Sequence, residues 1–378
     1  MTGCYPPRVG ITGVLFPRHR MGLNPEEVTI AKMLKRKEYA TACVGKWHLG
    51  HHPQFLPTRH GFDRYYGIPY SNDMDPKKGA SRNLDRAWME KDGSPWNVPL
   101  LRDDVEVERP VRQETLTRRY TEEAVRFIRT NAERPFFLYF PHTMPHIPLF
   151  VSEEFYDSDP HRAYAVTIAE IDWSVGQVLD TVRSLGIDEE TMVVYTSDNG
   201  PWLGMKHHGG SALPLRDGKF STYEGGMRVP CLMRWPGRIP SDRVSDGIGA
   251  AFDLLPTFAA LAGVSLDQDP LMDGVDLSDL VLGRGPSARN ELIYYKGANI
   301  QAIRRGPWKL NLGRVQRRRN RDDLVIPPTL HHLPSDLGEK KNVIDAHPDL
   351  VASLHQRVRE FGEALKATSR PAGTLDSP

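Results

Sequence analysis

The chain has 378 residues, which allows one large domain and a smaller one, and its 39% of apolar residues excludes intrinsic disorder as the main state. Lysine and arginine number 49 against 48 aspartates and glutamates, so the basic excess of a dedicated nucleic-acid binder is absent. No run approaches the roughly 18 apolar residues of a membrane span, and no signal segment is visible. Three scattered cysteines, Cys4, Cys43 and Cys231, exclude a disulfide framework.

The first two thirds of the sequence alternate helices and strands. Asn24-Pro25-Glu26-Glu27 is typical of a capped helix start and predicts a helix to about Arg36. Residues 51–112 are rich in Pro, Gly and charge, and we expect them to form a long surface insertion. The alternation predicts an α/β fold with a mostly parallel sheet flanked by helices. The remaining predicted elements are strands at 41–45, 136–140 and 191–196 (the first and the last of them buried) and helices at 117–131 and 161–185.

From about residue 252 the pattern changes to short strands separated by turns. It predicts a small C-terminal antiparallel α+β subdomain over 266–378, after a catalytic domain over 1–265. The basic run 314–321 is expected to be a solvated loop. The elements predicted here are helices at 252–261 and 347–365 and strands at 292–295, 301–304 and 308–312.

Polar clusters follow three of the predicted strands, at the edge where open α/β sheets bind ligands. Lys46 and His48 are two residues apart, so in extended chain they face the same side. Fixed cations suit an anionic substrate, because they stabilise the charge that develops as an ester oxygen leaves. We therefore expect separate loops to converge on one anion. Their candidates are Lys46, His48, His142, His146, Lys219 and Arg228 as cations, with Asp198 and Asn199 as oxygen donors.

Five polar and glycine-containing motifs follow one another along the sequence: Gly45-Lys46-Trp47-His48-Leu49-Gly50, Gly67-Ile68-Pro69-Tyr70-Ser71, His146-Ile147-Pro148, Ser197-Asp198-Asn199-Gly200 and the segment from Asp217 to Gly226. In this order they resemble the type I sulfatases. The resemblance implies an alkaline-phosphatase-like α/β fold and hydrolysis of the sulfate monoester of a sulfated small molecule or glycan. It also implies an exported protein, in the periplasm, outside the cell or in the lysosome.

The resemblance also implies roles for individual residues. Lys46 would hold a sulfate oxygen and the nucleophile, and His48 would act as base on the covalent sulfated intermediate. His146 and Lys219 would bind the sulfate and protonate the departing alcohol, which needs a proton donor beside a fixed positive charge. Ser71 would be a minor substrate contact, although a turn-capping hydroxyl explains it almost as well.

The same resemblance implies a Ca²⁺ or Mg²⁺ site, of which Asp198 and Asn199 would form half. Hard oxygen ligands suit such a cation, and the cation neutralises the sulfate. Two ligands are too few for tight binding, because Ca²⁺ takes about six to eight oxygens. The family's two aspartate ligands on a first strand have no counterpart in the sequence, and we expect them to precede Met1.

The family's nucleophile is a formylglycine made from the cysteine of Cys-x-Pro-Ser-Arg. Cys4-Tyr5-Pro6-Pro7-Arg8 matches only the looser pattern, and the two glycines in Val9-Gly10-Ile11-Thr12-Gly13 disfavour the helix that should follow. Residues 1–10 instead match the family's element downstream of the nucleophile, so we interpret Cys4 as a decoy. We expect the nucleophile to lie upstream of Met1, the truncated chain to be inactive, and the neighbours of a lost first strand to have unpaired edges.

Two other functions stay open. One is hydrolysis of phosphate or phosphonate esters on the same fold, where Ser or Thr commonly replaces formylglycine. The other is a non-enzymatic relative that binds anions and never had the nucleophile. The identity of the missing nucleophile would discriminate between these alternatives and a sulfatase.

Overall fold

The computed structural model describes residues 1–79, 81–316 and 324–375, and its largest sheet has five strands. In spatial order they are β5 (Val105–Glu108), β4 (Leu100–Arg102), β3 (Arg64–Gly67), β2 (Ala40–Val44) and β6 (Phe136–Tyr139). β2 pairs in parallel with both β3 and β6, whereas β3, β4 and β5 pair antiparallel. The centre of the sheet is parallel as predicted, and the β4–β5 hairpin makes the whole sheet mixed.

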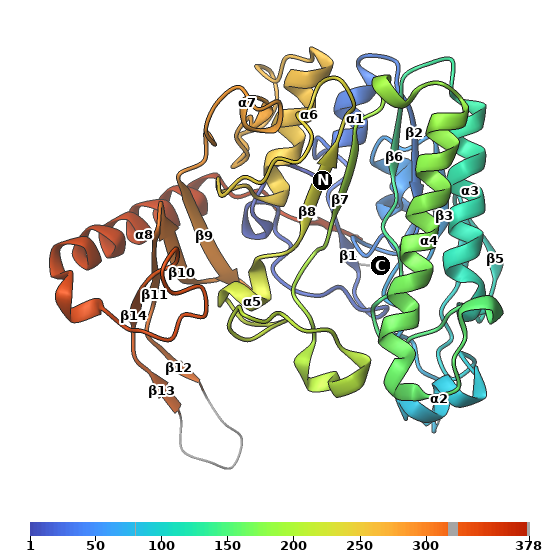
Figure 1. Cartoon of the computed structure of the whole chain (residues 1–378), viewed down its shortest axis with the longest axis horizontal. Helices are drawn as coiled ribbons and strands as arrows, with labels where there is room; N and C mark the ends of the chain where they lie inside the picture. Colours follow the sequence, from blue (N-terminus) through green and yellow to red (C-terminus); the bar gives the residue numbers. More distant parts are fainter. Residues whose placement is uncertain (80, 317–323, 376–378) are drawn as a thin grey trace.

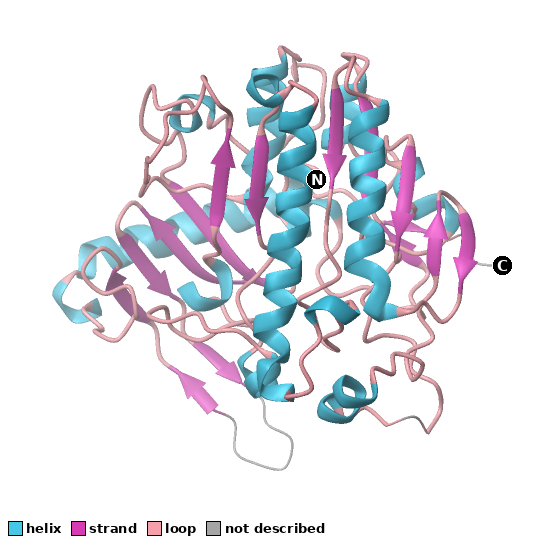
Figure 2. Ribbon diagram, turned by 45° about the vertical axis from the view of Figure 1, so that its right-hand side comes forward, coloured by secondary structure: helices cyan, strands magenta, loops and turns pink. Residues whose placement is uncertain are grey.

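Helices cover both faces of this sheet, so the main body has three layers (Figures 1 and 2). Side chains alternate along β2, since Ala42 and Val44 pack on one face and Cys43 on the other. Helices α3 and α4 lie side by side over the first face, and α1 and α6 pack together with Phe137 on the second. Their bounds are α1 (Ile30–Lys35), α3 (Leu116–Thr130), α4 (Ala163–Ser184) and α6 (Leu254–Ala262).

A separate antiparallel pair joins β7 (Val193–Thr196) to β8 (Cys231–Arg234). Within the described ranges β6 pairs only with β2, and β7 pairs only with β8. β6 and β7 therefore each have one unpaired edge, as any strand at the edge of an open sheet does. β7 was predicted to be buried, but Tyr195 is 42% exposed, because β7 has a strand partner on one side only.

The C-terminal region forms a four-stranded antiparallel sheet, as predicted. One long helix packs on it through an apolar cluster that includes Ile303, Leu310 and Leu354. Part of the basic run 314–321 forms a short hairpin strand, while its residues 317–321 lie outside the described ranges. The elements are β14 (Thr329–His332), β11 (Trp308–Asn311), β10 (Asn299–Arg305), β9 (Glu291–Lys296), the hairpin β12 (Arg314–Gln316) and β13 (Leu324–Ile326), α7 (Ser278–Val281) and α8 (Pro348–Thr368).

Two further predictions about local structure are wrong. The helix begins at Ile30 rather than after Asn24, because the Thr29 hydroxyl accepts from the Lys32 N–H and caps it there. The segment 51–112 is no surface insertion: it supplies β3, β4, β5 and α2 (Leu84–Glu90). Its apolar side chains, fully buried Trp88 and Trp96 among them, build part of the core.

The two ends of the sequence are tied to each other. β1 (Met21–Gly22) pairs with β15 (Gly373–Thr374), and Arg370 donates to the Glu27 carboxylate at 2.7 and 2.8 Å. Arg8 donates to the Thr368 hydroxyl at 2.5 Å. Among the described helices, none is long and apolar enough to cross a membrane.

Candidate active site

The loop that follows β2 carries Lys46 and His48 and lies against the loops that follow β3 and β6. The N–H of Lys46 donates to the Pro141 carbonyl at 2.8 Å, and the N–H of His48 donates to the Pro69 carbonyl at 3.2 Å. Gly45 permits this approach, because a Cβ there would lie 1.9 Å from the Pro141 oxygen. The carboxyl ends of three parallel strands thereby meet at one edge of the sheet, where α/β folds bind ligands.

The loops after β3 and β6 bring Ser71, Asp73 and His146 together. Ser71 Oγ lies 3.3 Å from His146 Nδ1, and Asp73 Oδ1 lies 3.9 Å from the same nitrogen. The Nδ1–H of His146 donates to the carbonyl of the following residue at 2.8 Å, which leaves Nε2 for a ligand. His48 is oriented the other way, because its Nε2–H donates to the Leu15 carbonyl at 3.0 Å and leaves Nδ1 for a ligand.

Lys219 and Asp198 come from loops that the Gly225-Gly226 pair packs together. The N–H of Gly200 donates to the Gly226 carbonyl at 3.0 Å. A Cβ on Gly200 would lie 1.8 Å from the Gly225 oxygen, and a Cβ on Gly225 would lie 2.2 Å from a backbone oxygen of the loop that leads to Lys219. These contacts require glycine because backbone meets backbone, so the pair fixes the position of Lys219 relative to Asp198.

The charges of these loops act on one another. Burial lowers the pKa of Lys46 and of Lys219, and the negative charge of Asp198 opposes both shifts. Burial, followed by the charge of Lys46, lowers the pKa of His48 and of His146 to about 4. The expected convergence of Lys46, His48, His146, Asp198 and Lys219 is therefore present. We call these five residues the anion cluster; at pH 7 its imidazoles are neutral.

Acid should lower stability through His48 and His146. Their pKa is 6.5 in the unfolded chain and about 4 in the folded chain. As pH falls from about 6.5 to 4, the unfolded state binds protons that the folded state does not, so the free energy of unfolding falls over this window. We expect urea unfolding at about pH 7.5, 6 and 4.5 to show this slope, and His48→Gln and His146→Gln each to reduce it. A slope that neither substitution changes would contradict the assignment.

Cys4 lies outside the anion cluster, in the apolar core under the chain ends. Its sulfur accepts a hydrogen bond from Arg370 Nη2 at 3.4 Å, and burial raises the pKa of the thiol, which makes it a poor nucleophile. The residues that follow form only the 3₁₀ turn η1 (Pro6–Val9) instead of an α-helix. Arg8 in this turn donates to both carboxylate oxygens of Asp273. These contacts favour the decoy interpretation of Cys4.

In the described part of the chain, two cations singled out from the sequence make no hydrogen bond, ion pair or ring contact with the anion cluster. The His142 ring packs 4.3 Å from the Phe140 ring, burial lowers its pKa to about 4, and neither ring nitrogen has a hydrogen-bond partner there. Arg228 is exposed, and its N–H donates to the Glu224 carbonyl at 2.7 Å, where the short helix α5 (Glu224–Met227) ends.

Sequence analysis missed three residues at this site. Asp73 opposes the pKa shifts of both lysines and of both imidazoles, and one of its oxygens is buried without a hydrogen-bond partner among the described residues. Its position two residues after Ser71 is the signal that could have found it.

The other two missed residues are Trp202 and Phe220. Lys219 Nζ lies 5.1 Å from the Trp202 ring and 5.4 Å from the Phe220 ring, and these rings lie 5.2 Å apart. They border the anion cluster with aromatic surface.

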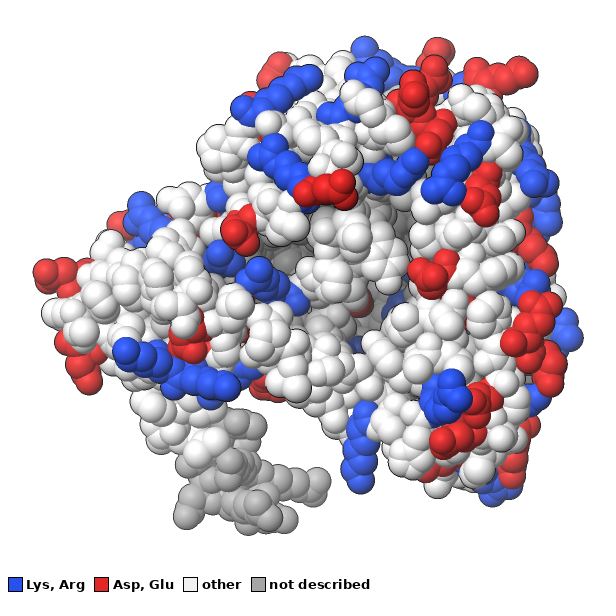
Figure 3. Space-filling model, viewed as in Figure 1, with Lys and Arg blue, Asp and Glu red and all other residues white. Residues whose placement is uncertain are grey.

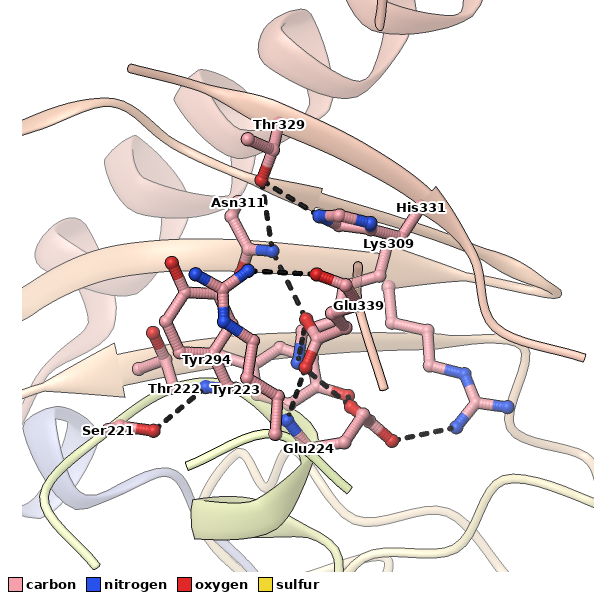
Figure 4. Close-up of polar contacts among 12 residues, drawn as sticks. Ser221, Thr222, Tyr223, Glu224, Tyr294, Lys309, Asn311, Thr329, His331 and Glu339 are labelled. Atoms are coloured by element: carbon pink, nitrogen blue, oxygen red, sulfur yellow. Dashed lines mark hydrogen bonds and ion pairs between the residues drawn. The ribbon is translucent and has the colours of Figure 1, made fainter. Parts of the chain in front are cut away.

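A buried ionic cluster includes Glu224, the first residue of α5 (Figure 4). Because Glu224 directly precedes Gly225 and Gly226, the cluster helps to hold the glycine pair in place. Lys309 Nζ lies 2.9 Å from Glu224 Oε1 and 3.1 Å from Glu339 Oε1, and all three side chains are at most 1% exposed. The Tyr294 hydroxyl donates to Glu224 at 3.0 Å, and Asn311 Nδ2 donates to Glu339 at 3.1 Å. β9 and β11 of the C-terminal sheet are thereby joined to the segment that positions Lys219.

Asp198 and Asn199, directly after β7, suit a hard cation by their chemistry. Asn199 Nδ2 donates to the Gly200 carbonyl at 3.0 Å, which leaves its Oδ1 as a ligand atom. Two oxygens are only part of the shell that Ca²⁺ or Mg²⁺ takes. A second possible metal site is made of aspartate and histidine residues on other elements, namely Asp85, His207 and His208.

Comparison with known proteins gives one consistent result. A family model described as Sulfatase matches residues 1–264. Arylsulfatase A of Bos taurus is 37% identical, over 99% of this chain and 78% of that protein. N-acetylgalactosamine-6-sulfatase of Canis lupus familiaris is 38% identical, over 76% of this chain and 55% of that protein.

Solved structures agree in fold. Ps i-CgsB in complex with k-i-k-neocarrahexaose superposes with a TM-score of 0.79 at 27% identity, over 100% of this chain and 82% of that chain. The PsFucS1 sulfatase from Pseudoalteromonas sp. superposes with a TM-score of 0.80 at 24% identity, over 98% of this chain and 80% of that chain. The chain therefore has the alkaline-phosphatase-like fold of these enzymes, belongs to the sulfatase family and is a sulfuric ester hydrolase.

Proposed function

We propose that the anion cluster binds the sulfate group of a sulfate monoester and that its residues divide the work of cleaving the ester. The observation that carries this proposal is the convergence of Lys46 and Lys219 beside two imidazoles at the carboxyl ends of β2 and β6. The lysines hold the sulfate oxygens and stabilise the charge that develops as the S–O bond breaks. Ser71, within reach of His146, adds a hydroxyl contact.

The orientation of each imidazole assigns its proton. The Nε2–H of His48 donates to the Leu15 carbonyl, so Nδ1 is the basic nitrogen. This nitrogen accepts a proton from the attacking nucleophile. His146 keeps its Nδ1–H on the backbone, so Nε2 must gain a proton before it can donate one to the departing alcohol. A bound sulfate raises the pKa of His146 because its negative charge stabilises the imidazolium. Lys219 is the second donor on that side.

None of the three cysteines of the sequence is the attacking group in our proposal. Cys4 and Cys43 are buried, and burial raises the pKa of each thiol, while Cys231 at the start of β8 also has a raised pKa. Formylglycine remains the nucleophile that the resemblance implies. A hard cation on Asp198 and Asn199 would supply further positive charge beside the sulfate.

We propose a sulfated glycan or a sulfated small molecule as substrate. Trp202 and Phe220 border Lys219 with aromatic faces, which suit the apolar face of a sugar or an aryl ring. Figure 3 shows that the face carrying α4 is hollowed beside its centre and that charges of both signs are interspersed over it.

The domain boundary at 265/266 and an exported location remain predictions. The match to the family model ends at residue 264, which supports the first of them.

Phosphate or phosphonate ester hydrolysis is the alternative of the same fold. A phosphonate monoester hydrolase from Silicibacter pomeroyi superposes with a TM-score of 0.61 at 17% identity, which shows shared fold only.

Calorimetric titration of the purified chain with inorganic sulfate, and separately with phosphate, tests the proposal. We expect saturable sulfate binding, tighter than phosphate binding, and we expect Cys4→Ser to leave it unchanged. Assay with an aryl sulfate provides the second measurement. Turnover that Cys4→Ser abolishes would overturn the decoy interpretation, and absence of sulfate binding would overturn the assignment of the anion cluster. Preference for phosphate, with cleavage of an aryl phosphate, would favour the alternative.

A further inference from the structure

Two segments far apart in the sequence converge on one carboxylate that the anion cluster does not use. Asp85 Oδ1, in the first turn of α2, accepts from His207 Nε2 and from His208 Nε2, each at 2.7 Å. The ligand atoms of the three side chains all lie within 4.8 Å of one another. The two histidines end η8 (Leu203–His208), so the contact joins the 51–112 segment to the loop that precedes Lys219.

The backbone is bent to make this contact. Consecutive side chains normally point in different directions, but Lys206 has φ 52° and ψ −122°, and the kink brings both imidazoles to one oxygen. The His208 side chain is only 4% exposed, and its Nδ1 has no hydrogen-bond partner among the described residues. Among the described residues, the hydrogen bond from His208 Nε2 to Asp85 is thus the one that orients this buried ring. The Asp85 side chain is 46% exposed, so an ion from solution can reach the group.

We propose that Asp85, His207 and His208 form a binding site for a divalent transition metal ion, with Zn²⁺ the best match. Two imidazole nitrogens and one carboxylate oxygen are a ligand set that Zn²⁺ uses, whereas Ca²⁺ and Mg²⁺ prefer oxygen ligands alone. Bonds of about 2.0–2.2 Å in a tetrahedron separate ligand atoms by about 3.3 Å. The 2.7 Å contacts need to open by only about 0.6 Å. Water from the exposed side fills the fourth position.

An ion at this site would also stabilise one wall of the anion cluster. Trp202, the residue before η8, has its ring 6.1 Å from the His146 ring and 5.1 Å from Lys219 Nζ. Zinc would fix the other end of η8 on α2 and so hold Trp202 in place. This consequence rests on the proposed function, whereas the binding of zinc does not.

Zinc titration of the purified chain against a chromophoric chelator, in excess Ca²⁺ to saturate oxygen-only sites, tests the proposal. We expect one Zn²⁺ per chain. Asp85→Asn and His207→Gln should each weaken zinc binding at least about tenfold, the smallest loss typical of a disturbed metal site. His52→Gln is the matched control: it removes one imidazole from another adjacent pair, with rings 4.1 Å apart, to which the described contacts assign no carboxylate.

The substitution of Asp85 decides the result, because this side chain is half exposed and its loss should leave the fold intact, as far-UV circular dichroism can verify. Zinc affinity equal in the wild type and in Asp85→Asn, or no stoichiometric zinc at all, would show that the three side chains form only a hydrogen-bonded group. Sulfate titration of the same samples keeps the two proposals separate. Loss of zinc binding with sulfate binding retained tests this site alone.

Discussion

Lys309→Met should lower the free energy of unfolding by about 3–5 kcal/mol at pH 7, the cost of removing one partner of a buried ion pair. Lys309 is fully buried between the carboxylates of Glu224 and Glu339, and methionine would leave both without their cation. Urea unfolding followed by circular dichroism measures the loss. Glu339→Gln in the same background should recover part of it, because one of the two unpaired charges is then gone.

The pH dependence of this loss has a defined sign. Burial raises the pKa of Glu224, but Lys309 and Arg304 together lower it below its ordinary value, so the wild-type stabilisation is present at neutral pH and is lost in acid. Without Lys309 that pKa rises, so the folded variant takes up a proton at a higher pH than the wild type does. The loss of stability in the variant should therefore become smaller as the pH is lowered. Lys35→Met, which breaks an exposed pair with Asp63, should cost less than about 1 kcal/mol. Equal effects of the two substitutions would contradict the buried-cluster argument.

Lys46→Met should weaken sulfate binding at least about 30-fold, or about 2 kcal/mol, as expected when one partner of a buried charge contact is removed. The substitution should also raise the pKa of His48 and of His146, because the charge of Lys46 lowers both. Calorimetry measures the first effect, and NMR titration of the imidazole protons measures the second. The two readouts together distinguish loss of the Lys46 charge from general unfolding.

Lys78→Met provides the control for Lys46→Met. Lys78 is exposed, and its loss should change neither sulfate affinity nor the imidazole titrations. Sulfate affinity that Lys46→Met leaves within about threefold of the wild type, a change of less than 1 kcal/mol, would remove Lys46 from the anion cluster.

The long helices could be predicted from sequence because the helical spacing of their apolar residues repeats over several turns. Helices α3, α4 and α8 lie within three residues of their predicted bounds. The segment 51–112 could not be predicted in this way. Its strands are only three or four residues long, and its buried tryptophans stand among Pro, Gly and charged residues, so no periodic pattern forms.

The anion cluster could be predicted because each member lies within a motif of the sequence, and four of the five lie in loops that directly follow a strand. Asp73 was missed because a single aspartate after a turn has an ordinary structural explanation. Asp85 and His208 are 123 residues apart in the sequence, and no spacing rule connects them. Only packing of α2 against the loop that holds η8 brings them together.

The tie between the chain ends has a consequence for synthesis on the ribosome. Arg370 contacts Glu27 and Cys4 across 343 and 366 residues, and Arg8 contacts Thr368 across 360. At about 5–20 residues per second, these partners emerge roughly 20–70 s apart. The apolar residues around Cys4 therefore stay without these partners until residues 368–370 have been translated, and chaperones that shield nascent chains have that interval in which to act.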